Sequence, residues 1–123
     1  MDVATMDHHG NRDAVNENMV KLFQPRVWIE QVWSSDHPGH EVLVRATSKF
    51  LYSGERDLFA TNMLQPNKDV IGPIIDNSYK SQQGHILVRV LEGGKIYYVI
   101  ILDDTKEKLQ VKEVFGPYNS LVK

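Results

Sequence analysis

The chain has 123 residues, with fourteen lysines and arginines, sixteen acidic residues and no cysteine. This length predicts one domain, and 41% hydrophobic with 24% charged residues predicts a globular fold rather than a disordered or fibrous one. A net charge of −2 argues against a strongly basic nucleic-acid-binding surface. The lack of cysteine excludes disulfides, thiolate nucleophiles and zinc–cysteine sites.

The hydrophobic pattern predicts a cytoplasmic protein without membrane contact. The longest apolar run, Ile96 to Leu102, is too short to cross a bilayer. The first residues lack the basic and then apolar layout of a signal peptide.

In the first half of the chain we expect a mobile tail over 1–12, followed by a single domain over 13–123. An apolar stripe from Val15 to Phe23 predicts a short helix that ends before Pro25. The spacing of apolar residues predicts a second helix over 55–64. Three further segments have the pattern of strands: 26–33, 42–46 and 49–52.

The second half is more plainly β-rich. Strands are predicted over 86–90 and 96–102, and the glycines of the intervening 92–95 segment favour a tight hairpin. A charged turn over 103–108 precedes a further strand over 109–115.

Several segments of the chain recur later in the same order. Residues 68–73 (KDVIGP) match 112–117 (KEVFGP), and 43–45 (LVR) match 87–89. The repeat predicts two related units, 26–73 and 74–117, each with three strands and a Gly-Pro terminator. Because neither unit can bury its apolar face alone, we expect them to pack together. The predicted fold is α+β, mainly antiparallel: a six-stranded barrel or two-sheet sandwich with a short N-terminal helix.

The second unit also resembles a known family over residues 84–117. The residues that carry the likeness are 87–89 (LVR), 103–106 (DDTK) and 112–117 (KEVFGP). With these segments the chain resembles the small β-barrel core protein of H/ACA ribonucleoproteins and its assembly-factor relative. The resemblance implies a six-stranded barrel and a non-catalytic scaffold that docks on a pseudouridine synthase and touches RNA little.

A metal site is weighed at residues 36–41 (DHPGHE). His37 and His40 lie between two carboxylates, and imidazole and carboxylate groups are common metal ligands. Their spacing is not that of a helical zinc site, and His8 and His9 could contribute only if the tail folds back. The sequence therefore favours a polar surface turn, and we expect neither a metal nor a cofactor.

An enzymatic alternative is a small metal-independent ribonuclease. His85, Arg89, Lys95 and Tyr97 could supply a proton shuttle and phosphate-stabilising cations on an antiparallel sheet. Because residues of the same parity share a face of a strand, His85 and Arg89 would lie together.

The function that the sequence favours is a non-catalytic interaction module or scaffold. The partner is expected to be a protein, within a ribonucleoprotein or outside one, with any RNA contact indirect, and a homodimer is compatible with the sequence. Arginine and aromatic side chains commonly anchor such contacts. The predicted binding residues are Arg45, Lys49, Arg89, Lys95 and the two Gly-Pro turns, Gly72–Pro73 and Gly116–Pro117.

Overall fold

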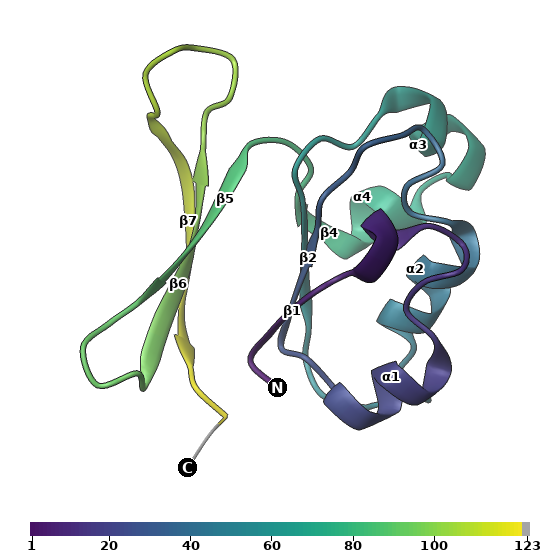
Figure 1. The fold of residues 1–123 in the computed structure, drawn as a ribbon, viewed down its shortest axis with the longest axis horizontal. Helices are drawn as coiled ribbons and strands as arrows, with labels where there is room; N and C mark the ends of the chain where they lie inside the picture. The colour runs from purple at the N-terminus through teal and green to yellow at the C-terminus, as the bar shows by residue number, and fades with distance from the viewer. Residues whose placement is uncertain (122–123) are drawn as a thin grey trace.

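The computed structural model describes residues 1–121, so the last two residues of the predicted domain, 122–123, lie outside the described part of the chain. The described residues form three layers (Figure 1): a parallel sheet in the middle, helices on one of its faces and an antiparallel sheet on the other. The fold is α+β, as expected, but its strands are divided between one parallel and one antiparallel sheet.

The parallel sheet is built from short strands joined by helical crossovers. Its strands are neighbours in chain order: β1 (Val3–Thr5), β2 (Val27–Glu30), β3 (Asp57–Ala60) and β4 (Tyr79–Ser81). The crossovers contain the 3-10 element η1 (Asp7–Gly10) and the helices α1 (Glu17–Phe23), α2 (His40–Thr47), α3 (Gln65–Ile71) and α4 (Ile74–Ser78). Neighbouring parallel strands require such crossovers, and here the helices gather on one face of the sheet.

The antiparallel sheet is a meander formed by the rest of the chain. Its strands are β5 (His85–Val90), β6 (Ile96–Leu102) and β7 (Val111–Asn119), in that order. Gly93 and Gly94 at the first turn both have positive φ, a conformation that glycine adopts without strain. The hairpin predicted from the sequence between 86 and 102 is therefore confirmed.

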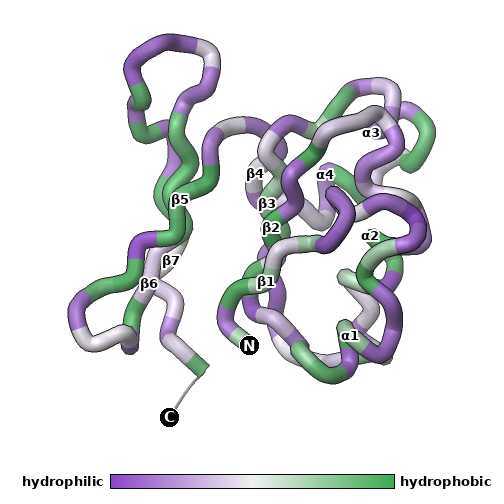
Figure 2. The backbone as a smooth tube through the Cα atoms, in the orientation of Figure 1, coloured by the Kyte–Doolittle hydropathy of each residue, from purple (hydrophilic) through white to green (hydrophobic). Residues whose placement is uncertain are grey.

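Both faces of the parallel sheet are buried, as the alternation along β2 illustrates. Trp28 packs among the helices, whereas Val27 and Ile29 pack against the antiparallel sheet. Between the two sheets, the rings of Phe59 and Phe115 meet edge to face with 5.0 Å between centroids. Figure 2 shows the hydrophobic residues along β5 and the largely hydrophilic loop that joins β6 to β7.

The predicted mainly antiparallel fold, a six-stranded barrel or two-sheet sandwich, is wrong: residues 1–121 form no closed barrel, and the sheet of the first half is parallel. Residues 42–46 belong to helix α2 because Val42, Leu43 and Ala46 share its buried face, a helical spacing that outweighs β-branched composition. Residues 49–52 lie in a turn and its exit. Residues 57–60 form strand β3 rather than a helix, since its consecutive apolar residues are buried on both faces of the sheet.

The matching segments of the repeat have different structures. Residues 43–45 are helical, whereas 87–89 lie in β5. Residues 68–71 belong to α3, whereas 112–117 lie in β7. The expectation that 26–73 and 74–117 each form three strands is therefore wrong, because similar short strings fold according to which of their faces is buried.

The N-terminal residues, where a mobile tail was expected over 1–12, contribute a strand to the parallel sheet. Strand β1 pairs with β2 in a parallel register. The terminal ammonium of Met1 donates to the carbonyl of Phe23 at 3.0 Å, and the N–H of Val27 donates to the carbonyl of Asp2 at 2.9 Å. Within residues 1–121, no helix has the length and apolar character needed to span a membrane.

The contact between the two sheets should dominate the stability of the fold. Phe59→Ala should lower the free energy of unfolding by about 3–5 kcal/mol, because it leaves a cavity between the sheets. The matched control is Phe50→Ala, whose side chain is 93% exposed and which should change stability by less than about 0.5 kcal/mol. Urea denaturation of both variants measures the difference, and similar losses in the two would contradict this packing.

Candidate functional site

The polar residues of greatest interest lie at the carboxyl ends of the parallel strands. The strands of this sheet follow one another in chain order, so no reversal of strand order marks a ligand crevice, and the site is argued from its side chains. Here η1 follows β1 directly, and residues 31–37 follow β2. The N–H of Met6 donates to the carbonyl of Ile29 at 2.9 Å, which holds the two exits side by side.

The segment Asp7–Gly10, called here the histidine turn, has an unusual backbone. His8, His9 and Gly10 follow one another with φ of 44°, 56° and 74°. The left-handed region costs a non-glycine residue about 1–2 kcal/mol, so the surrounding structure must hold both histidines in it. One such contact is a hydrogen bond from the N–H of Val15 to Asp7 Oδ1 at 3.0 Å. Backbone strain of this kind is concentrated at functional sites.

Both imidazole rings of the turn form a hydrogen bond through Nδ1, although their planes are tilted by 55°. His9 Nδ1 lies 2.7 Å from the carbonyl oxygen of Gln31, an acceptor only, so the hydrogen is on Nδ1. His8 Nδ1 lies 2.8 Å from Asp13 Oδ1, which favours the same tautomer. In both neutral rings the lone pair is then left on Nε2. Metal-ligating histidines typically donate their other ring N–H to a carboxylate or a backbone carbonyl in this manner.

His37 is buried next to the turn and has the opposite tautomer. Its Nδ1 accepts hydrogen bonds from the backbone N–H groups of Trp33 and Ser34, at 3.2 and 3.1 Å. Its ring stacks on that of His9, with 5.2 Å between centroids and 6° between planes. Burial lowers the pKa of His37, although Asp36 opposes this shift. The ring is therefore neutral at pH 7 and fixes the position of His9.

The buried carboxyl group of Glu30 packs against the histidine turn at Gly10. Glu30 Oε1 accepts a hydrogen bond of 2.5 Å from the hydroxyl of Tyr79, while Oε2 has no hydrogen-bond partner among the described residues. Burial raises the pKa of Glu30 to about 8, so the group is mostly protonated at pH 7. Oε2 lies so close to Gly10 that a Cβ there would be 2.6 Å away. A side chain at position 10 would therefore force Glu30 or the turn to move.

One exposed aromatic side chain lies beside the histidines. Trp33 is 80% exposed, and its ring centroid is 6.3 Å from that of His9. The chain's other tryptophan, Trp28, is buried and donates to the hydroxyl of Tyr52 at 3.0 Å. Trp33 is therefore positioned as a fluorescent reporter of events at the histidine turn.

The described residues form no closed metal site, although two imidazole rings lie near one another in the histidine turn. No three histidine or acidic side chains of residues 1–121 converge as metal ligands. The centroids of His8 and His9 are 6.4 Å apart, against about 5 Å when both bind one tetrahedral ion at about 2.0–2.1 Å from each nitrogen. Binding a shared ion would therefore require the rings to approach by about 1 Å.

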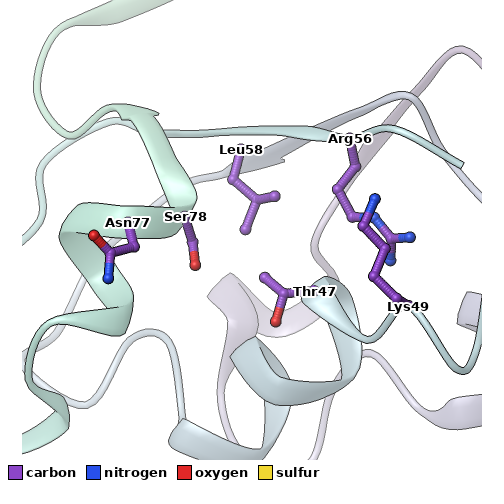
Figure 3. Close-up of a pocket in the computed structure, with 6 residues that line it drawn as sticks. All are labelled: Thr47, Lys49, Arg56, Leu58, Asn77 and Ser78. Atoms are coloured by element: carbon purple, nitrogen blue, oxygen red, sulfur yellow. The ribbon is translucent and has the colours of Figure 1, made fainter. Parts of the chain in front are cut away.

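Two of the cations predicted to bind a partner form hydrogen bonds within the fold. Arg45 in α2 donates to the carbonyls of Val15 and Ala14 at 2.7 and 2.9 Å, and Lys49 donates to the carbonyl of Gly54. Lys49 also lines a shallow cavity of about 180 Å³ at the amino ends of β3 and β4 (Figure 3). Its neighbour Arg56 donates to carbonyls of the same loop, so both cations of this cavity are already engaged.

The residues of the ribonuclease alternative are not gathered at one place. His85 and Arg89 share the outer face of β5, as their spacing predicts. Tyr97 points to the opposite, inner face, where it is buried and stacks on Tyr118 with 5.1 Å between centroids. Lys95 lies at the end of the hairpin turn.

The remaining predicted site residues are dispersed. Gly72 and Pro73 join α3 to α4 on the helical side of the parallel sheet. Gly116 and Pro117 lie within β7, in the other layer. His40 begins α2 and is exposed. Of the two histidines considered as metal ligands, only His37 packs against the histidine turn.

Sequence reasoning missed Glu30 and Tyr79. It considered His9 as a metal ligand only if the N-terminal segment folds back, and in the structure the ring of His9 does stack on that of His37. Glu30 had one signal: it follows an apolar run that predicts a buried strand. Tyr79 lies forty-nine residues further along the chain, and nothing in the sequence links the two. Comparison with family models, curated proteins and solved structures finds no match to this chain.

The buried carboxyl group predicts a specific dependence of stability on pH. The folded-state pKa of Glu30, about 8, lies above its ordinary value of 4.5. Its contribution to stability is therefore complete below pH 4.5 and lost as pH rises through 8, by at most about 1.4 kcal/mol per pH unit. Glu30→Gln removes this ionisation and keeps an acceptor for Tyr79. Urea denaturation between pH 4.5 and 8 should show the stability of the variant rising relative to wild type, and parallel pH profiles would contradict the assignment.

The contact beneath the turn can be separated from backbone strain by two glycine variants. Gly10→Ala should destabilise the protein more than Gly94→Ala, because its new methyl group meets Glu30. Gly94 has a similar φ, 72° against 74°, and open space around its Cβ position, so it reports only the conformational strain of about 1–2 kcal/mol. Equal losses in thermal denaturation would show that the close approach to Glu30 is not a constraint.

Proposed function

We propose that this protein is a metal-dependent hydrolase, in which His8 and His9 bind a divalent ion of the zinc class at the carboxyl end of the parallel sheet. The observation that carries the proposal is the hydrogen bond that both rings form through Nδ1. Each Nδ1 is fixed by an oxygen, which leaves each Nε2 as a ligand. Water, substrate or further ligands would occupy the other coordination positions.

The chemistry follows from an open coordination sphere. A catalytic zinc ion keeps at least one position for water, and its charge lowers the pKa of that water to about 7. The same ion polarises a carbonyl or phosphoryl oxygen of the substrate. The neutral, stacked His37 would hold His9 in place, and neutral Glu30 would support the turn without adding a negative charge. The reaction class supported best is hydrolysis of an ester or phosphoester.

Metal binding can be tested through Trp33. Titration with Ni²⁺ or Co²⁺ should quench the exposed Trp33, whose ring is 6.3 Å from that of His9, and should leave the buried Trp28 largely unaffected. His9→Ala should abolish the saturable quenching and His8→Ala should weaken binding at least tenfold. His40→Ala, which changes an exposed histidine outside the turn, is the matched control and should bind as wild type does.

Isothermal titration with Zn²⁺ provides the same comparison without fluorescence. Hydrolysis of bis(p-nitrophenyl) phosphate and p-nitrophenyl acetate, with and without a chelator, then tests the reaction class. Quenching that survives His9→Ala, or is lost equally in His40→Ala, would contradict the site. Binding without metal-dependent hydrolysis of either ester would contradict the reaction class.

The scaffold and ribonuclease functions considered from the sequence have less support than metal binding. The residues expected to bind a protein partner lie on separate layers, and the predicted ribonuclease residues point to opposite faces of one sheet. The scaffold role, the RNA association and the cytoplasmic location stay predictions.

A further inference from the structure

We propose that the free edge of β5 pairs with β5 of a second copy of this chain, which extends the antiparallel sheet across a two-fold axis. This inference is independent of the metal site. It rests on the backbone groups of β5, on the incomplete burial of its side chains, and on the contrast with the other edge of the same sheet.

Three residues of β5 have backbone N–H and carbonyl groups that face no neighbouring strand. The N–H of Leu91 donates to the carbonyl of Ile96 at 2.9 Å, and the register places Val90 opposite Tyr97. Since hydrogen-bonded pairs alternate in antiparallel ladders, the polar groups of Ile86, Val88 and Val90 point away from β6. Among residues 1–121, no backbone hydrogen bond joins these three to any element outside their sheet.

The side chains of the same three residues are incompletely covered. They face the parallel sheet together with Tyr97, Val99 and Ile101 of β6, which are fully buried. Ile86 and Val88 are only half-buried, and Val90 is 59% exposed. The apolar layer thus continues to the free edge of β5, and a further strand there would cover it.

The opposite edge of the sheet, β7, is protected against such pairing. Glu113 lies opposite Ile101 and places a charge on the inner face at the rim. Pro117, which has no N–H to offer, lies within the strand beside Gly116. Inward charges and prolines are devices that block edge-to-edge association. Between 86 and 90, β5 has no proline, no bulge and no inward charge.

One symmetric register uses all the free groups of β5. In this register Val88 lies opposite the partner's Val88, Ile86 opposite the partner's Val90, and Val90 opposite the partner's Ile86. Every outward N–H and carbonyl group of β5 is then hydrogen-bonded. On the outer face, Leu87 then lies opposite the partner's Arg89. No like charges are directly opposed, and the arginine stem can pack on leucine. A second copy therefore fits this edge without any change of sequence.

The register predicts opposite effects for two substitutions at one exposed position. Leu87→Lys places a positive charge opposite the partner's Arg89 and should weaken the dimer about tenfold, since the pair occurs twice by symmetry. Leu87→Glu removes the same leucine, which is 48% exposed, but places a negative charge opposite that arginine. The dimer of this variant should be as stable as the wild-type dimer, or more stable. Val88→Pro removes an outward N–H and should also weaken the dimer, with the ladder to β6 kept.

Sedimentation velocity over a concentration series measures the dimer constant, with circular dichroism to confirm that each variant is folded. A concentration-dependent wild-type dimer, weakened by Leu87→Lys and not by Leu87→Glu, supports the proposal. A monomer at every concentration, a dimer that responds equally to both charges, or a dimer unaffected by Val88→Pro would overturn it. Metal titrations are unaffected by these outcomes, because none of the substituted residues lies at the histidine turn.

Discussion

The parallel sheet must be covered on both of its faces, and most of the architecture follows from this constraint. Its strands have only three or four residues each, so each contributes one or two side chains to either face. Trp28 and Leu58 belong to the core beneath the helices, whereas Val27 and Phe59 belong to the core beneath the antiparallel sheet. A sheet this small gains enough apolar burial only when both layers are present.

The same constraint produces the chemistry at the carboxyl end of the sheet. Glu30 is the last residue of β2, and its burial leaves it mostly protonated at pH 7. Its Oε2, which has no hydrogen-bond partner among the described residues, lies where a Cβ at position 10 would clash, and that position is Gly10. Gly10 in turn ends the left-handed segment in which His8 and His9 are held. The orientation of the imidazoles is thus linked, through one glycine and one carboxyl group, to the packing of the central strand.

Local patterns were sufficient where an element depends on local interactions. The helix expected between 15 and 23 is present as α1, capped by Asn16, whose side chain accepts from the N–H of Met19 at 2.9 Å. The β5–β6 hairpin follows from its glycines and alternating residues. Segments whose type depends on which faces are buried could not be decided this way, as α2 and β3 show. The amphipathic spacing in α2 was present in the sequence, but β-branched composition concealed it.

The candidate site was only partly visible in the sequence, because it joins residues distant along the chain. The histidines are conspicuous in the sequence by residue type, but the sequence does not show that the N-terminal segment brings His9 next to His37. Their geometry depends on contacts with Gln31, His37 and Glu30 that no spacing rule reveals. Arg45 illustrates the converse, since a cation that suggests a binding surface is used to hold the carbonyls of Ala14 and Val15. A charged residue in a small domain is often part of its scaffold.

The central claim is that the hydrogen-bonded Nδ1 atoms of the histidine turn leave Nε2 as the ligand nitrogen, whereas the buried His37 uses Nδ1 as an acceptor. Long-range ¹H–¹⁵N NMR spectra of the metal-free protein, recorded above pH 7, read the tautomer of each histidine directly. We expect the ring hydrogen on Nδ1 in His9 and on Nε2 in His37. A hydrogen on Nε2 of His9 would mean that its bond to Gln31 is not formed, and the proposed ligand geometry would be wrong.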